Sequence, residues 1–283
     1  MKSISSNMQE VLRNKFPTWT NDTEQGKYDL CLSNDLDSLL SCLYLEQLKG
    51  YKVNYFYDFN RIFKANDTGK KVIGVDMALE HGMVWDNHIT KLHKSDQVNQ
   101  NAANVNAVTG ISRDNYYQKF CGSTLLQILS YYKVPMPKSR EAKLILLAID
   151  STFLGYYSND FKQINHNWLE QLQLYELLDV LESEPTKAEF YRVKKQYNLD
   201  SQIQVNDNGI LSTNIDLAAM QGLFAFPLCL SAEKFNITHT FKRTGRYELT
   251  KGREYSKHDI RGLYSIALTH KNKFKYTAGS KTV

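Results

Sequence analysis

The chain has 283 residues, of which 42% are hydrophobic and 23% are charged, and its formal net charge is +5. This length can bury a sizeable core, so we expect one large domain or two modest ones. Glycine and proline are scarce, which argues against a disordered or Gly-rich linker protein. The positive charge favours an anionic partner, but it does not by itself establish nucleic-acid binding.

Neither secretion nor membrane insertion is expected. The segment from Met1 to Glu10 is polar and lacks the apolar core of a signal peptide. No apolar stretch approaches the roughly 18 residues needed to span a bilayer. The four cysteines show no Cys-x-x-Cys spacing, which indicates reduced thiols and a cytoplasmic protein.

The N-terminal part of the chain begins with an extension over residues 1–26, in which a short helix is expected from Met8 to Lys15. Tyr28 to Leu32 reads as a short buried strand, and Val53 to Tyr57 supplies another. Between these strands, Ser38 to Lys49 has the apolar spacing of an amphipathic helix.

Two carboxylates, Asp35 and Asp37, lie where the first strand gives way to the helix. Ligands of open α/β sheets bind at the carboxyl ends of the strands. Two carboxylates this close repel each other unless a cation or a basic group lies between them, so the pair suggests a metal site. The alternative is an N-cap of the helix that starts at Ser38, for which a single Asp would be enough.

Acidic residues also end the next strand-like segments. The apolar segment from Lys71 ends in Asp76, and the one from Met83 ends in Asp86-Asn87-His88. Carboxyl ends of parallel strands share one edge of a sheet, so these side chains are expected to meet, although each Asp alone could be a turn former. Downstream, Ala142 to Ile149 is an apolar helical segment that Asp150 follows directly.

We expect an α/β fold with a parallel sheet covered by helices on both faces, followed by a smaller, strand-rich α+β domain. The expected divisions are an extension (1–26), a metal-binding α/β domain (27–160), a helical linker (161–198) and a substrate-binding α+β domain (199–283). The linker contains an expected helix from Trp168 to Leu181. The last domain ends in two strands, Leu263 to Leu268 and Lys273 to Tyr276.

Basic residues concentrate in the last 45 residues of the chain. Surface charge is the ordinary interpretation of any one of them. We hypothesise that a subset faces the acidic sheet edge and binds substrate phosphates, since Arg suits bidentate phosphate contacts. The candidates are Arg243, Arg246, Arg253 and Arg261.

The order of these acidic segments resembles the DHH phosphoesterase superfamily. This superfamily includes single-strand-specific exonucleases, phosphodiesterases of short oligonucleotides and cyclic dinucleotides, and family II inorganic pyrophosphatases. Its first motif, an Asp-x-Asp after the first strand, resembles Ser33 to Asp37. Its second motif matches Asp76, its Asp-His-His signature resembles Asp86-Asn87-His88, and its helix-borne fourth motif matches Asp150. Order and rough spacing agree over residues 27 to about 155.

The resemblance implies a metal-dependent phosphoesterase that acts on a phosphate-containing substrate such as a single-stranded nucleic acid or a small nucleotide. Mn²⁺ or Mg²⁺ would suit the oxygen-rich set of ligands. The implied metal ligands are Asp35, Asp37, Asp76, Asp150 and the Asn87 amide. The implied catalytic residues are His88, as general acid, and Asp86. We place Ser33 and Asn34 among the residues that bind substrate.

The chain also departs from the superfamily pattern. Ser33 stands where the first motif usually has a His nearby, and Asn87 replaces the first His of the signature. We find no copy of the family's Gly-rich, His-containing loop after residue 190, and one hypothesis is that His81 or Glu80 replaces a missing ligand. Three interpretations therefore remain open: a phosphodiesterase, a non-hydrolysing binding protein of the same fold, and an unrelated α/β nucleotide-binding domain. The oligomeric state is left open.

Overall fold

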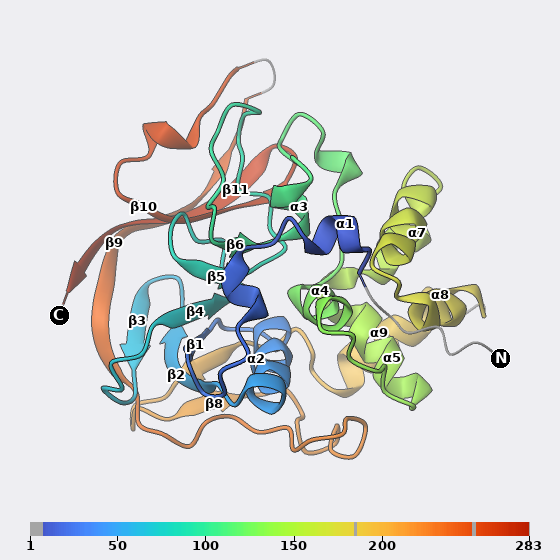
Figure 1. Ribbon diagram of the computed structural model, residues 1–283, viewed down its shortest axis with the longest axis horizontal. Helices are drawn as coiled ribbons and strands as arrows, with labels where there is room; N and C mark the ends of the chain where they lie inside the picture. The colour runs from blue at the N-terminus through green and yellow to red at the C-terminus, as the bar shows by residue number, and fades with distance from the viewer. Residues whose placement is uncertain (1–7, 184–185, 251–252, 283) are drawn as a thin grey trace.

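The computed structural model describes residues 8–183, 186–250 and 253–282. Within these residues, nine strands form one mixed sheet in the order β10-β11-β9-β3-β2-β1-β4-β5-β6 (Figure 1). The strands are β1 (Asp29–Leu32), β2 (Lys52–Tyr57), β3 (Arg61–Lys64), β4 (Val72–Val75), β5 (Met83–Trp85), β6 (Ala102–Ala103), β9 (Asn236–Glu248), β10 (Leu263–His270) and β11 (Lys273–Thr282). A separate antiparallel pair is formed by β7 (Ile203–Val205) and β8 (Leu211–Thr213).

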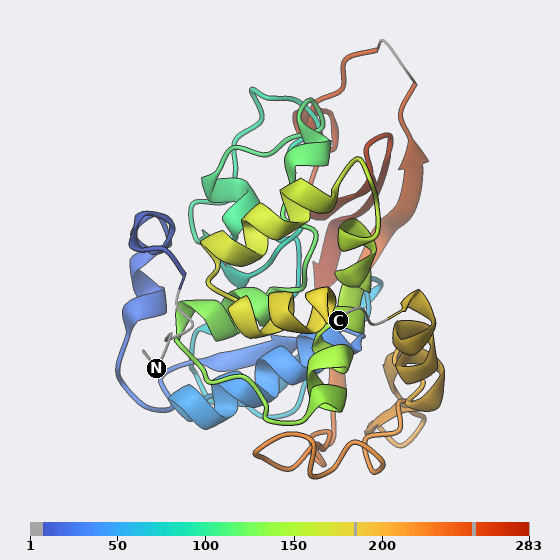
Figure 2. The same ribbon diagram turned by 90° about the vertical axis from the view of Figure 1, so that its right-hand side faces the viewer.

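The helices gather mainly beside this sheet. They are α1 (Glu10–Arg13), α2 (Leu36–Lys49), α3 (Val105–Val108), α4 (Thr124–Tyr131), α5 (Arg140–Ala148), α6 (Phe153–Tyr156), α7 (Lys162–Gln171), α8 (Tyr175–Glu182) and α9 (Lys187–Gln196). Figure 1 shows α4, α5 and α7 to α9 at one side of the molecule, and in Figure 2 these helices face the viewer. No helix in the described part of the chain is long and apolar enough to cross a bilayer.

The predicted parallel sheet is confirmed for five strands. β2, β1, β4, β5 and β6 pair in parallel. Their short apolar sequences suit strands that are buried on both faces, and α2 supplies the crossover between β1 and β2.

The strands near the C-terminus extend the same sheet. β3 turns back antiparallel to β2, and β9 pairs with β3, with Thr240 opposite Arg61. β11 and β10 follow as antiparallel neighbours, so the two predicted final strands are confirmed. Because β9 to β11 hydrogen bond into the sheet that contains β1, the expected second domain is not confirmed, and the division into domains stays a prediction.

The far end of the sheet curls back over the parallel strands. The backbone N–H of Ile266 in β10 donates to the carbonyl of Ala78 at 2.9 Å, and Glu80 donates to the carbonyl of Tyr264 at 2.8 Å. Ala78 and Glu80 lie in the loop that follows β4, which ends at Val75. The curl therefore brings the C-terminal strands next to the carboxyl ends of the parallel strands.

The two faces of the parallel strands are packed differently. Leu30 and Leu32 of β1 belong to the large core that includes buried residues of α2, α4 and α5. Cys31 points to the other face and belongs to a cluster with Phe241 of β9 and Tyr264 of β10. Within the described residues this second cluster contains no helical side chain, so the expectation of helices on both faces is wrong there. The curled end of the sheet covers that face instead.

One predicted helix is divided. The expected helix from Trp168 to Leu181 consists of α7 and α8, which meet at Gln173. Gln173 has a left-handed backbone with φ 53°, and the N–H of Leu174 donates to the carbonyl of Leu169 at 2.8 Å. Apolar spacing continues through this turn, so periodicity alone did not reveal the break.

Candidate metal centre

Strand register aligns the carboxyl ends of four parallel strands. One row of paired residues crosses the sheet, made up of Leu32, Val75, Trp85 and Ala103. The residue after each of these is polar; the four are Ser33, Asp76, Asp86 and Asn104. The register therefore places four polar residues along one edge of the sheet, as the sequence predicted for the acidic segments.

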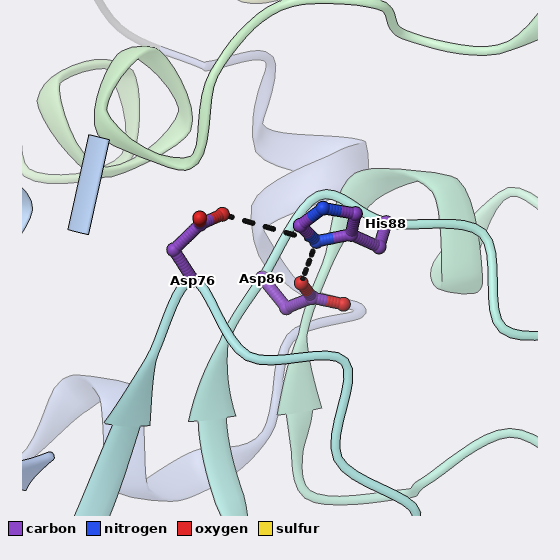
Figure 3. A group of neighbouring side chains, drawn as sticks. All are labelled: Asp76, Asp86 and His88. Atoms are coloured by element: carbon purple, nitrogen blue, oxygen red, sulfur yellow. Dashed lines mark hydrogen bonds and ion pairs between the residues drawn. The ribbon is translucent and has the colours of Figure 1, made fainter. Parts of the chain in front are cut away.

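Five side chains gather at this edge in two overlapping groups. One ligand atom each from Asp76, Asp86 and His88 lies within 4.8 Å of the others, and the same is true of Asp37, Asp76 and Asp150. Figure 3 shows Asp76 and Asp86 at the tips of neighbouring strands, with the His88 ring turned toward both. Asp76 belongs to both groups, so its carboxylate is the shared member of the cluster.

Hydrogen bonds hold Asp86 and His88 against each other. The Nδ1 atom of His88 lies 2.7 Å from Oδ1 of Asp86 and 3.8 Å from Oδ1 of Asp76. The other oxygen of Asp86 accepts a hydrogen bond from Nδ2 of Asn104 at 2.8 Å. Asn104 also donates to the backbone carbonyl of His88 at 2.8 Å. The Asp86–His88 pair is thus oriented by a third side chain from β6's carboxyl end.

The N-terminus of α4 holds the other side of the cluster. The backbone N–H groups of Thr124 and Leu125 donate to the two oxygens of Asp37 at 2.7 and 2.8 Å. The Thr124 hydroxyl donates to Oδ1 of Asp76 at 2.7 Å. A helix N-terminus stabilises negative charge, so α4 offsets part of the repulsion between the two carboxylates.

Two of the acidic residues have left-handed backbones. Asp76 has φ 56°, and Asp150 has φ 51° and ψ 16° at the break between α5 and α6. Such conformations are uncommon for residues other than glycine and concentrate at functional sites. At these two positions the conformation brings both side chains into the cluster of Asp37.

The acidic cluster perturbs the ionisation of its members. Burial, followed by the charge of Asp76, raises the pKa of Asp37 well above its ordinary value. Burial, followed by the charge of Asp35, also raises the pKa of Asp76 well above its ordinary value. Burial alone would lower the pKa of His88, but the neighbouring carboxylates, Asp86 first, outweigh it and raise that pKa to about 10. These buried carboxylates therefore lack enough positive charge around them.

Asp35 and Asp37 have different surroundings. Asp35 is the N-cap of α2 and accepts a hydrogen bond from the backbone N–H of Ser38 at 3.1 Å. Within the described residues it belongs to neither group of close ligand atoms. Burial and the charge of Asp150 raise its pKa to about 6, so it still lies near the cluster. The capping interpretation thus applies to Asp35, and the metal interpretation fits Asp37 better.

Two buried side-chain oxygens at this edge of the sheet have no hydrogen-bond partner in the described part of the chain. Within the described residues, the Ser33 hydroxyl and the Oδ1 atom of Asn87 are buried without a hydrogen-bond partner. Nδ2 of Asn87 donates to the carbonyl of Gly122. A buried unpaired oxygen is costly and fits a site that is completed by a ligand. Asn34 is half-buried, and its carbonyl accepts from the N–H of Ile203 at 2.9 Å.

The four candidate arginines make different contacts. Arg246 lies opposite Lys275 in the β9–β11 pairing, and its charge contributes to the lowered pKa of Lys275. Arg243 donates to the backbone carbonyl of Arg261. The guanidinium of Arg253 lies 5.3 Å from the centre of the Tyr255 ring. Their binding of substrate phosphates stays a prediction.

Sequence reasoning assigned no role in this site to three of its contributors. Lys275 on β11 lies near enough to Asp35 for each charge to shift the pKa of the other. Thr124 binds Asp76, and Asn104 binds Asp86. Asn104 follows an apolar pair at a strand end, which is a usable signal, whereas nothing local marks Lys275 because the curl of the sheet places it.

The hypothesis on the loop after β4 finds no support. Glu80 forms an ion pair with Lys257, with Nζ 2.7 Å from Oε2. His81 is exposed, and neither residue belongs to the two ligand groups found in the described part of the chain.

The donor set fits a hard divalent cation. The cluster offers carboxylate oxygens from Asp37, Asp76, Asp86 and Asp150, with one imidazole, and oxygen donors suit Mn²⁺ and Mg²⁺. No protein-family model, curated protein or solved structure matches the chain. A function can therefore be inferred only from the geometry of the site itself.

Proposed function

We propose that the chain is a metal-dependent phosphoesterase that hydrolyses a phosphodiester of a short or single-stranded nucleic acid or of a small nucleotide. One observation carries the proposal: Asp76 is shared by a group with Asp37 and Asp150 and a group with Asp86 and His88. A shared carboxylate between two ligand groups is the arrangement expected where two cations lie side by side. Mn²⁺ or Mg²⁺ is the proposed cofactor.

The chemistry needs an activated water, neutralised phosphate oxygens and a proton for the leaving oxygen. Bound divalent cations would supply the first two. In this proposal the second group would bind a cation through the oxygens of Asp76 and Asp86. Asp86 also orients the imidazole of His88, which is partly exposed and donates a proton or a hydrogen bond to the phosphate rather than binding a cation. The α4 N-terminus fixes Asp37, and Thr124 fixes Asp76, so the carboxylates are positioned before substrate arrives.

We further propose that the chain is a divergent member of the DHH superfamily. The support is that residues at the four motif positions, Asp37, Asp76, Asp86 with His88, and Asp150, converge in space although they are spread over more than a hundred residues of sequence. Ser33 and Asn87 replace superfamily imidazoles, and both keep an unpaired oxygen that could face a ligand.

The second candidate is a protein of the same fold that binds a nucleotide, a nucleic acid or another protein without hydrolysing a substrate. The observation that favours it is the contact of Nδ2 of Asn87 with the Gly122 carbonyl, since this contact restricts how the amide can turn. A site with fewer imidazole ligands binds cations more weakly and need not support turnover.

Mn²⁺-dependent hydrolysis tests the proposal. Purified protein should hydrolyse bis(p-nitrophenyl) phosphate or a short oligonucleotide in Mn²⁺, and Asp76→Asn should lower kcat by at least ~100-fold. Asp29→Asn is the matched control, because Asp29 is also a buried aspartate but its carboxylate binds Asn54 and Thr68 instead.

Three outcomes separate the interpretations. Turnover that disappears in Asp76→Asn and persists in Asp29→Asn supports the enzyme. Saturable Mn²⁺ binding without turnover of any phosphodiester supports the binding protein. Absence of saturable divalent-cation binding in calorimetry would remove both and favour the unrelated α/β domain.

A further inference from the structure

We infer that an aromatic pocket beside Asp150, walled by Tyr116, Tyr117 and Phe161, binds the base of a nucleotide whose phosphate lies at the acidic cluster. The inference rests on the proposed function and adds to it the place where the base of the nucleotide binds. The three aromatic residues belong to none of the motifs that the sequence analysis identified.

The pocket adjoins the candidate metal centre. A cavity of about 180 Å³ is lined by His88, Asn87 and Asp150. A second cavity, of about 370 Å³, is lined by the aromatic residues and also by Asp150. Lys119 lines both cavities as well. A molecule with its phosphate beside Asp150 can therefore extend directly into the aromatic pocket.

The pocket wall is largely apolar and partly exposed. The rings of Tyr117 and Phe161 stack with centroids 5.4 Å apart and an angle of 21° between their planes. Tyr117 is 45% exposed and Leu154, on the same wall, is 40% exposed. These side chains line one cavity, and contiguous apolar surface of this kind commonly marks a binding site, while aromatic rings are the usual surface against which bases stack.

Polar groups in the pocket suit a nucleotide rather than a purely apolar ligand. Lys119 lines both cavities, so its ammonium group is available to a phosphate bound beside Asp150. Lys271 adds positive charge, with its Nζ 5.0 Å from the centre of the Tyr117 ring. Asn165, 4% exposed, lines the pocket, and within the described residues its Oδ1 has no hydrogen-bond partner. The amino group of a base such as adenine could donate to this oxygen.

The charge of the centre makes binding depend on a cation. Asp150, Asp76 and Asp37 would repel a phosphate in the absence of a divalent ion. The base pocket contributes apolar contact that does not depend on charge. The two contributions can therefore be measured separately with one ligand that has a base and one that lacks it.

The test compares adenosine 5′-monophosphate with ribose 5-phosphate by isothermal titration calorimetry in Mn²⁺. The full-length protein should bind the nucleotide more tightly than the sugar phosphate. Stacking of one base is expected to account for a roughly 5- to 150-fold difference in affinity. Tyr117→Ala and Phe161→Ala should each move the ratio of the two affinities toward one, whereas Tyr117→Phe should preserve it.

Tyr247→Ala is the matched control. Tyr247 is also exposed and stacks on a phenylalanine, Phe274, at 5.7 Å, but it does not line the aromatic pocket. Its substitution should leave the affinity ratio unchanged.

Failure of the pocket and failure of the proposed function are distinguishable. Equal affinity of the unaltered protein for the two ligands, with Mn²⁺-dependent hydrolysis intact, would overturn the base pocket alone. An unchanged ratio in both Tyr117→Ala and Phe161→Ala, in folded protein, would do the same. If neither ligand binds in Mn²⁺ and no phosphodiester is hydrolysed, both inferences are wrong.

Discussion

Replacement of Asp76 by Asn should have opposite effects on stability with and without a divalent cation. Asp76 has ligand oxygens within 4.8 Å of those of Asp37 and Asp150. Asparagine tolerates the left-handed backbone at φ 56°, and its oxygen can still accept from the Thr124 hydroxyl. The substitution therefore removes charge with little change of shape.

The expected size follows from the spacing of the carboxylates. Two unit charges 4.8 Å apart repel by about 3.5 kcal/mol at an effective dielectric constant of 20. The raised pKa values of Asp37 and Asp76 mean that part of this charge is already neutralised by protons, so less of the repulsion remains. We expect metal-free Asp76→Asn to be more stable than the unaltered protein by about 1–2 kcal/mol.

Mn²⁺ should reverse that order. A ligand at 100 times its Kd stabilises the folded state by about 2.7 kcal/mol, which for a chain of this size corresponds to a rise in Tm of roughly 5–10 °C. Asp76→Asn loses the carboxylate common to both groups and should gain little. Differential scanning calorimetry in EDTA and in Mn²⁺ measures the stability of each protein without and with the cation. The control, Asp29→Asn, should respond to Mn²⁺ like the unaltered protein.

Two results would refute this reasoning. One is an equal gain in Tm from Mn²⁺ in Asp76→Asn and in the unaltered protein. The other is a metal-free Asp76→Asn protein that is strongly destabilised, which would mean that the carboxylate serves structure rather than cation binding.

Three further predictions concern charge and packing. Lys275→Gln should strengthen Mn²⁺ binding and weaken binding of adenosine 5′-monophosphate, each by a few-fold, because it removes a positive charge near Asp35. If calorimetry showed that the two affinities change in the same direction, this prediction would be contradicted. Arg192→Ala should cost about 0.5–1 kcal/mol at pH 7, since Arg192 is the main cause of the lowered pKa of the partly exposed Glu141. A carboxylate with a depressed pKa stabilises the fold above its ordinary value of 4.5 and loses that effect as pH falls, so urea unfolding should show the difference shrinking in acid. Leu129→Ala, at a fully buried position of α4, should cost about 2–5 kcal/mol in the same assay, and a cost under 1 kcal/mol would mean that the helix is loosely packed.

Much of the parallel part of the fold follows from local sequence. The apolar runs before Ser33, Asp76 and Asp86 form β1, β4 and β5 as expected. Each run is short and buried, and parallel pairing puts the residues that follow on one edge. That is why three acidic segments far apart in sequence could be expected to meet before any coordinates were known.

Other properties of the site depend on contacts between distant segments. Asp35 and Asp37 are equivalent in the sequence pattern, but only Asp37 lies under the N–H groups of α4, while Asp35 caps its own helix. Likewise, the spacing of polar residues says nothing about Lys275, which reaches the site through the order in which β9, β11 and β10 add to the sheet.

The sequence by itself thus determined that the segments of β1, β2, β4 and β5 are strands, which of these strands are followed by acidic residues, and that a parallel sheet would align those ends. Only the tertiary structure decided which carboxylates share a cluster and that an aromatic pocket adjoins Asp150. It also decided that the C-terminal strands join the same sheet and curl over one of its faces. The physical reason is the separation in sequence over which each kind of interaction acts. Periodicity and turn chemistry act between neighbours in sequence, whereas register, sheet curl and cavity walls come from pairings between residues that are tens to hundreds of positions apart.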